Sequence, residues 1–525
     1  MNLPPPPSRS STRHHVRVMG ATLHASGATL VTVEARFDPA GQADKGSTEI
    51  VLSGLPDPVI RESRGRMLAA LKESQLGLPP GKLLLHLGPA GLKKSGELLD
   101  LPLALATASA AGHIPKDALI GIVFLGELHL DGRLRAVPGG LATADVALAA
   151  GIRTLIAPPE TAREAAALPG VRAFEVSSLG EVVAILSGAP VTPLPAPRDG
   201  VESKVRATPR LDAIRGQAAG KRALEVAAAG GHGVLFFGPP GAGKSLLARA
   251  LSELMPPPTT AERVDMTRVL SAAGRWPGGL ASERSFRAPH HTTSHAGLVG
   301  GGSPPMAGEI TLAHHGVLFL DELPEFRRDV LEALRQPIEG GEILIARAGK
   351  QVLLPADFHL VCAMNPCPCG YLGHPKIPCR CSPFAVARYR GRISGPLMDR
   401  IDLRLELSPP SLADLLGEAG TETKAPNPEA SPGLLIANRA QAARERSLER
   451  QDRLNSRMGT DELDRFSPLT ADMRELLVRA TERHGLSARA IQSLRRVART
   501  LADLAGQELP GRAQLAEALA LRATL

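Results

Sequence analysis

The chemically most informative residues form a glycine-rich loop that ends in lysine and serine. The loop consists of Gly238, Pro239, Pro240, Gly241, Ala242, Gly243, Lys244 and Ser245. An apolar run before it predicts a strand over 233–237, and a helical pattern follows over 245–255. In such a loop the backbone N–H groups wrap phosphates, the lysine reaches the β- and γ-phosphates, and the serine hydroxyl binds Mg²⁺. The sequence therefore predicts a nucleoside triphosphate site, with ATP and Mg²⁺ as cofactors.

Two carboxylates follow a second apolar run, 317–320, and complete the expected site. Asp321 and Glu322 would stand at the carboxyl end of a strand, where ligands of α/β proteins bind. We expect Asp321 to hold Mg²⁺ through water and Glu322 to orient and deprotonate the attacking water. An acidic pair at this position can also serve only as a helix cap.

A third apolar run, 359–364, ends at Asn365. An asparagine there could sense the γ-phosphate or hold the lytic water, although an asparagine before Pro366 is also an ordinary turn former. A glycine-loop strand, then an acidic strand, then an asparagine-tipped strand is the order of parts in AAA+ ATPases, which this chain resembles. The order favours a role for Asn365 in hydrolysis.

Several longer motifs make the resemblance more specific. They are Ser-Phe-Arg-Ala-Pro-His-His over 285–291, the glycines of 300–302, 308–316, Asn-Pro-Cys-Pro-Cys-Gly over 365–370, 394–400 and Ser-Ala-Arg-Ala over 487–490. Together they resemble the magnesium-chelatase-like AAA+ family typified by ComM and YifB, over nearly the whole chain after its first residues. The resemblance implies a homohexameric ATPase ring and, as in ComM, a DNA helicase that promotes branch migration in natural transformation or recombination.

The same resemblance assigns roles to two arginines. Arg400 corresponds to an arginine finger, which a subunit contributes to its neighbour's γ-phosphate, and Arg489 corresponds to the sensor 2 arginine of a helical lid. A guanidinium supplied across an interface makes hydrolysis depend on assembly. The local alternative is an ion pair of Arg400 with Asp399 or Asp402.

The N-terminal region carries a second resemblance. The run 126–135 and the following Gly139-Gly140-Leu141 resemble the Lon protease domain, whose catalysis needs a serine and a lysine. Ala142 stands where Lon proteases carry the lysine, and 93–97 lacks their Gly-Pro-Ser pattern, so we expect no protease activity. The basic residues nearby could contact DNA phosphates or form an ordinary solvated face; they are Arg61, Arg64, Arg66, Lys93 and Lys94.

All five cysteines fall within 362–381. Two close pairs could close a tetrahedral Zn²⁺ site or remain reduced structural thiols; they are Cys367, Cys369, Cys379 and Cys381. His374 is a substitute ligand, and Cys362 is expected in the core.

Basic and histidine-rich loops supply candidate contacts with a threaded substrate. A hairpin over 340–355 would carry Arg347 and Lys350 near its turn, where they could contact a DNA backbone. The loop with His290, His291 and His295 is expected to line a pore.

Composition limits the kinds of partner. The net charge of +8 suits a polyanion but also an ordinary basic surface, and aromatics at 3% exclude base stacking as a major binding device. The sequence contains no run of about 18 apolar residues and no signal-peptide core, so we expect a cytoplasmic protein without a membrane partner.

The predicted fold class is α/β in three parts. We expect a disordered tail (1–15), a Lon-protease-like (S5-type) α/β domain (16–187), a linker (188–210), a P-loop AAA+ α/β/α core (211–408), a second linker (409–433) and a C-terminal helical lid bundle (434–525). The expected partners are further copies of the chain in a hexamer and single-stranded or branched DNA. The alternative is a magnesium-chelatase-like motor subunit or a regulatory ATPase that remodels a protein partner.

Overall fold

A computed structural model of the chain describes residues 15–39, 48–55, 57–89, 94, 97–195, 208–302, 306–347, 350–411 and 431–522. The chain divides into two compact units: 1–200 with 263–281 and 303–306, and 201–262 with 282–302 and 307–525. The predicted tail up to residue 14 and the central parts of both predicted linkers, 196–207 and 412–430, lie outside the described residues.

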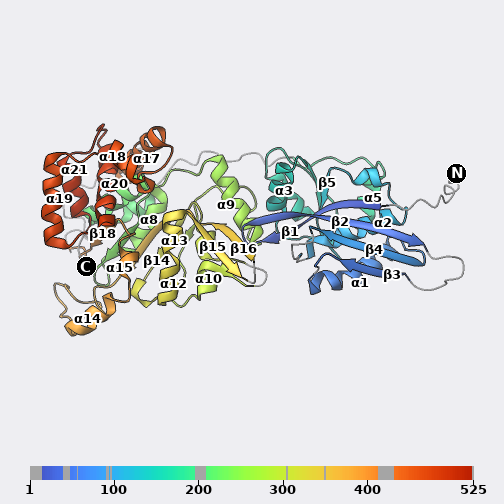
Figure 1. Cartoon of the computed structure of the whole chain (residues 1–525), viewed down its shortest axis with the longest axis horizontal. Helices are drawn as coiled ribbons and strands as arrows, with labels where there is room; N and C mark the ends of the chain where they lie inside the picture. Colours follow the sequence, from blue (N-terminus) through green and yellow to red (C-terminus); the bar gives the residue numbers. More distant parts are fainter. Residues whose placement is uncertain are drawn as a thin grey trace. The chain divides into compact units, whose positions relative to one another are not determined.

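The first unit is built on a seven-stranded mixed sheet (Figure 1). Its strand order is β3 (Glu49–Ser53), β4 (Gly81–Gly88), β2 (Gly27–Pro39), β1 (His15–His24), β5 (Ile122–Phe124), β8 (Thr154–Ala157) and β9 (Arg172–Glu175). The helices are α1 (Pro58–Glu73), α2 (Asp100–Ala110), α3 (Gly140–Ala149), α4 (Pro159–Ala166) and α5 (Leu179–Leu186), and most of α9 (Thr260–Ala272) also belongs to this unit. A short hairpin joins β6 (Glu127–Leu128) to β7 (Leu134–Arg135).

The second unit contains a five-stranded parallel sheet. Its order is β11 (Phe286–Arg287), β14 (Val317–Leu320), β17 (His359–Met364), β10 (Val234–Phe237) and β18 (Leu403–Glu406). Every residue of β10, β14 and β17 is buried, as expected for strands covered on both faces. Since the strands are parallel, their carboxyl ends share one edge of the sheet and their amino ends share the other.

Short elements surround this sheet. The helices are α6 (Pro209–Ala213), α7 (Ala218–Gly230), α8 (Lys244–Leu254), α10 (His295–Val299), α11 (Glu309–Leu312), α12 (Arg328–Ala333), α13 (Arg335–Gly340), α14 (Pro383–Arg390) and α15 (Gly395–Met398). The strands β15 (Glu342–Arg347) and β16 (Lys350–Pro355) form the predicted hairpin, and β12 (Gly300–Gly301) and β13 (Met306–Ala307) are short.

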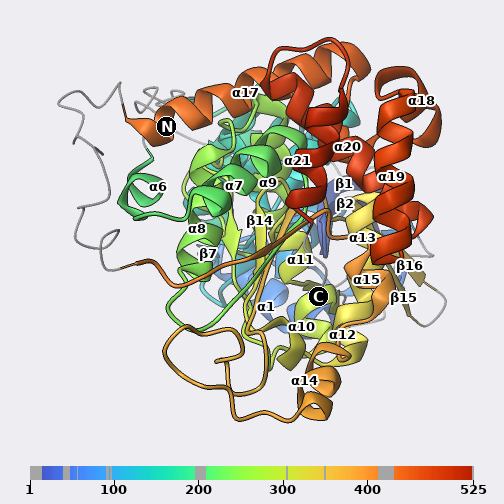
Figure 2. The same ribbon diagram turned by 90° about the vertical axis from the view of Figure 1, so that its left-hand side faces the viewer.

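The C-terminal part is helical, as the apolar spacing predicts. It contains α17 (Pro432–Gln451), α18 (Thr460–Phe466), α19 (Ala471–His484), α20 (Ala488–Leu504) and α21 (Arg512–Ala520), drawn in orange and red in Figure 2. Serine side chains accept the first free N–H groups of α17 and α20, at Ser431 and Ser487. Both α17 and α20 pack on α7, so this lid shares a hydrophobic core with the parallel sheet.

Candidate functional site

The glycine-rich loop joins β10 to α8 at the carboxyl edge of the parallel sheet. Gly241 and Gly243 adopt φ angles of 81° and 84°, which glycine reaches without a steric penalty. At Gly238 a Cβ atom would lie 2.1 Å from the carbonyl oxygen of Leu407, so the neighbouring chain leaves no space for a side chain. Three glycines therefore shape a loop that leads into the start of α8, and the N-terminus of a helix is a suitable place for an anion.

Lys244 and Asn365 lie together at this loop. The Lys244 Nζ atom donates to the carbonyl oxygens of Gly238 (2.6 Å) and Pro239 (3.0 Å) and to Oδ1 of Asn365 (3.1 Å). Asn365 reaches this place because β17 is the immediate parallel neighbour of β10. Partial burial lowers the pKa of Lys244, and the nearby Asp321 opposes that shift.

Ser245 and Asp321 supply the oxygen atoms that a Mg²⁺ site needs. The Ser245 hydroxyl donates to Oδ2 of Asp321 at 2.9 Å. A hydroxyl and one carboxylate, combined with phosphate oxygens and water, form the usual donor set for Mg²⁺ in nucleotide sites. These two side chains fit the role of holding the ion.

Glu322 has an unusual backbone and an unexpected neighbour. Its φ is 54°, in the left-handed region, which costs a non-glycine residue about 1–3 kcal/mol. Its side chain is half exposed, and Oε2 lies 3.0 Å from Nδ1 of His291. We expected His291 only in a pore loop; no sequence spacing links it to Glu322, because the contact depends on the fold of residues 285–302. Glu322 therefore has a polar partner, His291, from a segment distant in the sequence.

Arg400 and Arg489 meet on one carboxylate, that of Glu339. Arg400 donates to Oε2 of Glu339 at 3.0 Å, and Arg489 pairs with Oε1. Arg457 donates to the carbonyl oxygens of Ile338 and Glu339 and holds the end of α13 in place. Sequence reasoning missed Glu339, which belongs to none of the motifs.

This arginine cluster lies at the opposite edge of the sheet from the glycine-rich loop. Arg400 and Arg489 line a cavity of about 260 Å³ together with Gly231 and Gly233, which precede β10. The glycine-rich loop follows β10, and four residues at about 3.3 Å each separate the two edges by about 13 Å. Neither guanidinium is therefore beside the phosphate loop of its own chain.

The local ion pair considered for Arg400 is not formed. Asp399 accepts a hydrogen bond from Ser487 and lies 3.7 Å from Arg404, and Asp402 is bonded to His232 and Ser493. The alternative named the wrong acidic partner. Arg400 donates to the carbonyl oxygen of Pro396 in α15, and its guanidinium pairs with Glu339 and not with the adjacent aspartates.

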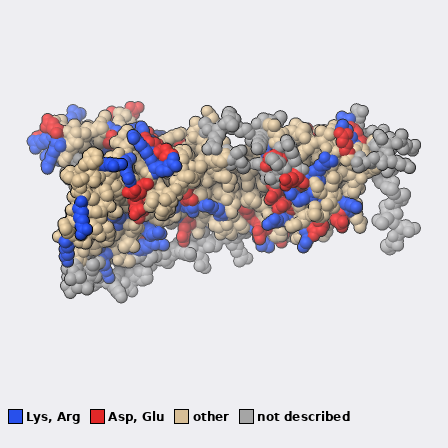
Figure 3. All heavy atoms as spheres, turned by 90° about the horizontal axis from the view of Figure 1, so that it is seen from below, with Lys and Arg blue, Asp and Glu red and all other residues tan. Residues whose placement is uncertain are grey.

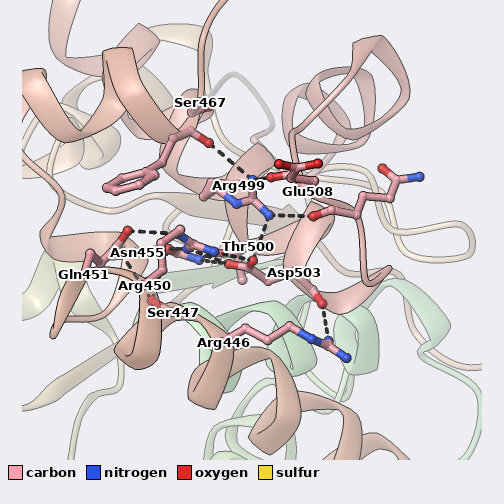
Figure 4. Close-up of polar contacts among 12 residues, drawn as sticks. Arg446, Ser447, Arg450, Gln451, Asn455, Ser467, Arg499, Thr500, Asp503 and Glu508 are labelled. Atoms are coloured by element: carbon pink, nitrogen blue, oxygen red, sulfur yellow. Dashed lines mark hydrogen bonds and ion pairs between the residues drawn. The ribbon is translucent and has the colours of Figure 1, made fainter.

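A buried polar network ties the lid to the sheet. His232, just before β10, bonds Asp402 and Thr500, each at 2.7 Å. Asn455 continues the network from Thr500 to Asp503. Figure 4 shows how Asp503 is then flanked by two guanidinium groups, those of Arg450 and Arg499. The network thus connects the lid to the residues just before the strand that carries the glycine-rich loop.

The two cysteine pairs come together. The Sγ atoms of Cys367, Cys369, Cys379 and Cys381 lie within 4.8 Å of one another. His374 is not in this group: its Nδ1 accepts the N–H groups of Lys376 and Ile377 and closes a turn. Cys362 is buried in β17, as expected of a core residue.

The N-terminal basic residues are placed differently from the expectation. Lys94 is fully buried and donates to the carbonyl oxygens of Gly54 and Pro89, so it cannot contact a DNA backbone. The predicted DNA contact of Lys94 was wrong because its ammonium group is used for hydrogen bonds to backbone carbonyls within the first unit. Arg66 pairs with Asp100, and Arg64 is exposed. Lys93 and the side chain of Arg61 lie outside the described residues.

For the two candidate DNA-contact residues of the hairpin, the structure describes only the backbone. Arg347 and Lys350 are register partners at the end of β15 and β16, and their side chains lie outside the described residues. Within the described ranges, none of the helices combines the length and the apolarity needed to cross a bilayer.

Known proteins resemble this chain over most of its length. It matches the families described as "Magnesium chelatase, subunit ChlI" over 210–415, "Subunit ChlI of Mg-chelatase" over 41–161 and "Magnesium chelatase, subunit ChlI C-terminal" over 432–522. YifB of Salmonella typhimurium is 38% identical over 487 residues, 91% of this chain and 92% of the relative. Competence protein ComM of Haemophilus influenzae is 38% identical over 508 residues, 94% of this chain and 95% of the relative.

A shorter match concerns a chelatase. The magnesium-chelatase 67 kDa subunit of Chlorobaculum parvum is 26% identical over 134 residues, which cover 26% of this chain and 19% of that subunit. The long matches at higher identity, together with the parallel sheet and its helical lid, decide the family: the chain belongs to the ComM/YifB family of magnesium-chelatase-like AAA+ ATPases.

Proposed function

We propose that this protein is an ATP-driven ring motor that acts on DNA, as a helicase or branch-migration factor in natural transformation or recombination. ATP hydrolysis to ADP and phosphate is the activity that its family implies. The action on DNA, the hexameric state and a cytoplasmic location are part of the proposal.

The position of Arg400 and Arg489 is the observation that supports a ring-shaped assembly. Both lie at the amino edge of the sheet, whereas the glycine-rich loop lies at the carboxyl edge. If the two guanidinium groups stabilise a transferring phosphoryl group, that group belongs to the nucleotide of a neighbouring copy. In a closed ring of identical head-to-tail contacts, every nucleotide site receives the two arginines of a neighbouring subunit.

Each residue of the candidate site has a proposed role in hydrolysis. Lys244 exchanges its carbonyl and Asn365 contacts for the β- and γ-phosphates, and Ser245 and Asp321 hold Mg²⁺, which neutralises phosphate charge when bound. Glu322 takes the proton of the attacking water, and His291 holds the Glu322 carboxylate in position. Asn365 contacts the γ-phosphate or the water.

DNA as the client is supported by one relative and by net charge. The ComM relative is named a competence protein, and the chain has a net charge of +8. On the face drawn in Figure 3, the described basic and acidic side chains are interspersed, so this face gives no separate support. The hairpin with Arg347 and Lys350 remains our candidate for backbone contact.

A second candidate function is favoured by the family descriptions. All three name a magnesium-chelatase subunit, which suits a motor that remodels a chelatase or another protein partner. The chelatase subunit match covers only 26% of this chain, however, and we rank this function below the DNA motor.

The test compares the stimulation of ATP hydrolysis by different clients. Purified protein is assayed with single-stranded DNA, forked DNA and an unfolded protein, over a range of salt concentrations, because DNA contacts weaken as salt rises. We expect forked or single-stranded DNA to stimulate turnover and forked DNA to be unwound. Stimulation by the unfolded protein alone would reject the DNA motor in favour of the second function.

We also propose that the four-cysteine cluster holds a structural Zn²⁺ ion. Four thiolates close a tetrahedral site and leave no position for a substrate.

A further inference from the structure

The four-cysteine cluster belongs to a segment inserted between β17 and α14. Cys367 and Cys369 follow Asn365 at the end of β17, and Cys379 and Cys381 directly precede α14. The segment thus begins at one residue of the nucleotide site and ends at a helix that contacts the same site.

The sulfur geometry fits one tetrahedral ion. The Sγ atom of Cys367 lies 3.4 Å from that of Cys369 and 3.6 Å from that of Cys379, and Cys369 and Cys379 are 3.6 Å apart. Zn–S bonds of about 2.3 Å in a tetrahedron place sulfurs about 3.8 Å apart, whereas a disulfide would place them at about 2.05 Å. The spacing therefore matches metal ligands and not disulfide partners.

Backbone N–H groups point at two of the four sulfur atoms. The N–H of Leu372 points at the sulfur of Cys367, and the N–H of Cys381 points at the sulfur of Cys379, both at 3.4 Å. Hydrogen bonds of this kind orient metal ligands and supply part of the charge compensation that four thiolates need. Four sulfur ligands in a tetrahedron select zinc over the harder Mg²⁺.

The turn between the first two ligands and the next pair lies against the glycine-rich loop. A Cβ atom on Gly370 would lie 3.1 Å from Cδ and 3.2 Å from Cγ of Pro240. Gly370 has a φ of 84°, and its N–H donates to the carbonyl oxygen of Cys367. The cysteine turn therefore lies so close to Pro240 that position 370 has little space for a side chain.

The helix after the second pair holds the other side of Asn365. The Tyr389 side chain hydrogen-bonds the backbone of Asn365, and Arg390 donates to the carbonyl oxygen of Pro366 at 3.1 Å. Asn365 itself accepts from Lys244. Both ends of the inserted segment thus lie beside Asn365, and the four cysteines, two at each end, could tie these ends together through one ion.

We propose that Zn²⁺ bound by the four cysteines positions Asn365 and Pro240 for hydrolysis, so that zinc occupancy sets the rate of ATP turnover and not the affinity for ATP. This inference rests on the proposed ATPase function. Affinity depends on Lys244 and on the N–H groups at the start of α8, which β10 and α8 hold on either side. The cysteine segment reaches the loop at Pro240, which has no N–H to offer a phosphate. Turnover also needs Asn365 at its place, and a displacement of about 1 Å in such a group lowers a rate by about 100-fold.

The experiment measures zinc, nucleotide affinity and turnover on the full chain. Single variants Cys379→Ser and Cys381→Ser remove one ligand each. His374→Asn is the matched control, because it keeps an acceptor for the turn but removes the alternative ligand. Zinc is measured by plasma mass spectrometry, nucleotide affinity with a fluorescent ATP analogue, and folding by circular dichroism.

We expect about one Zn²⁺ per chain in the wild type and in His374→Asn, and its loss in both cysteine variants. Turnover should fall about 10- to 100-fold in the zinc-free variants, with analogue affinity within about threefold of the wild type. If the variants misfold, a mercurial reagent can extract zinc from the wild-type protein, and zinc added back after thiol reduction should restore turnover.

Two results would overturn the inference: wild-type protein without zinc after growth in zinc-rich medium, or zinc-free protein that hydrolyses ATP at the wild-type rate. Zinc-loaded wild type that binds the analogue but never hydrolyses ATP, with or without clients, would instead reject the proposed function. The measured zinc content separates these cases.

Discussion

Glu339 provides a sharp prediction, since one carboxylate pairs with both arginines of the shared site. The perturbation is Glu339→Gln, which keeps the size of the side chain and removes its charge. In our account the arginines must leave Glu339 before they can stabilise the phosphates of a neighbouring copy. The variant should therefore assemble into active rings more readily than the wild type.

The expected magnitude follows from exposure. The Glu339 and Arg489 side chains are 44% and 43% exposed, so solvent screens their interaction, while Arg400 is only 9% exposed. Exposed pairs contribute about 0.2–1 kcal/mol each. If the exposed Arg489 pair lies at the lower end of that range and the less exposed Arg400 pair near its upper end, the two sum to about 1 kcal/mol. A change of about 1 kcal/mol corresponds to about a fivefold change in an equilibrium constant.

The assay is ATP turnover as a function of protein concentration. The concentration of half-maximal turnover per subunit should fall about fivefold in Glu339→Gln, and the difference should shrink at high salt because exposed charges are screened. Glu342→Gln, at a nearby exposed acidic residue of β15, is the control and should behave as the wild type. A loss of turnover in Glu339→Gln as large as that in Arg400→Ala would refute the reasoning, since Glu339 would then be required for hydrolysis itself.

Three further predictions test other parts of the site. Lys244→Ala should abolish binding of a fluorescent ATP analogue in equilibrium titrations; retention of wild-type affinity would contradict the role of the loop. Asp503→Ala leaves the buried Arg499 without its carboxylate and should lower the free energy of unfolding by about 3–5 kcal/mol in urea, whereas a change below about 1 kcal/mol would show that the network is dispensable. Burial opposes ionisation of Asp402, but hydrogen bonds from His232 and Ser493 outweigh it and lower the pKa of its carboxyl. The stability that ionised Asp402 contributes is thus present above the unfolded-state pKa of about 4 and is lost as pH falls through the lower folded-state pKa. The difference in unfolding free energy between wild type and Asp402→Asn should therefore shrink below about pH 4. A difference that stays constant over this range would show that Asp402 does not titrate.

Local patterns predicted the elements that carry chemistry. The strands before Gly238, Asp321 and Asn365 are continuous apolar runs, and the structure places them as adjacent parallel strands. Such runs are recognisable because parallel strands are buried on both faces. The helical spacing from residue 434 onward was equally clear.

Contacts between residues far apart in the sequence could not be predicted from the sequence. Glu339 is 61 residues from Arg400 and 150 from Arg489, and no periodicity relates them. His291 was expected in a pore loop, yet it lies beside Glu322. Lys94 belongs to a charged pair in the sequence and gave no sign that it would be buried. Each of these placements results from packing between segments, which composition and spacing do not encode.

The central claim is that each nucleotide site is completed by the arginines of an adjacent copy. The most direct measurement mixes two inactive proteins, Lys244→Ala and Arg400→Ala, in equal amounts. The first cannot bind ATP but still supplies Arg400 to its neighbour, and the second binds ATP but supplies no arginine. Random mixing makes about one site in four complete, so the account predicts about a quarter of the wild-type turnover. A mixture as inactive as its two components would contradict it.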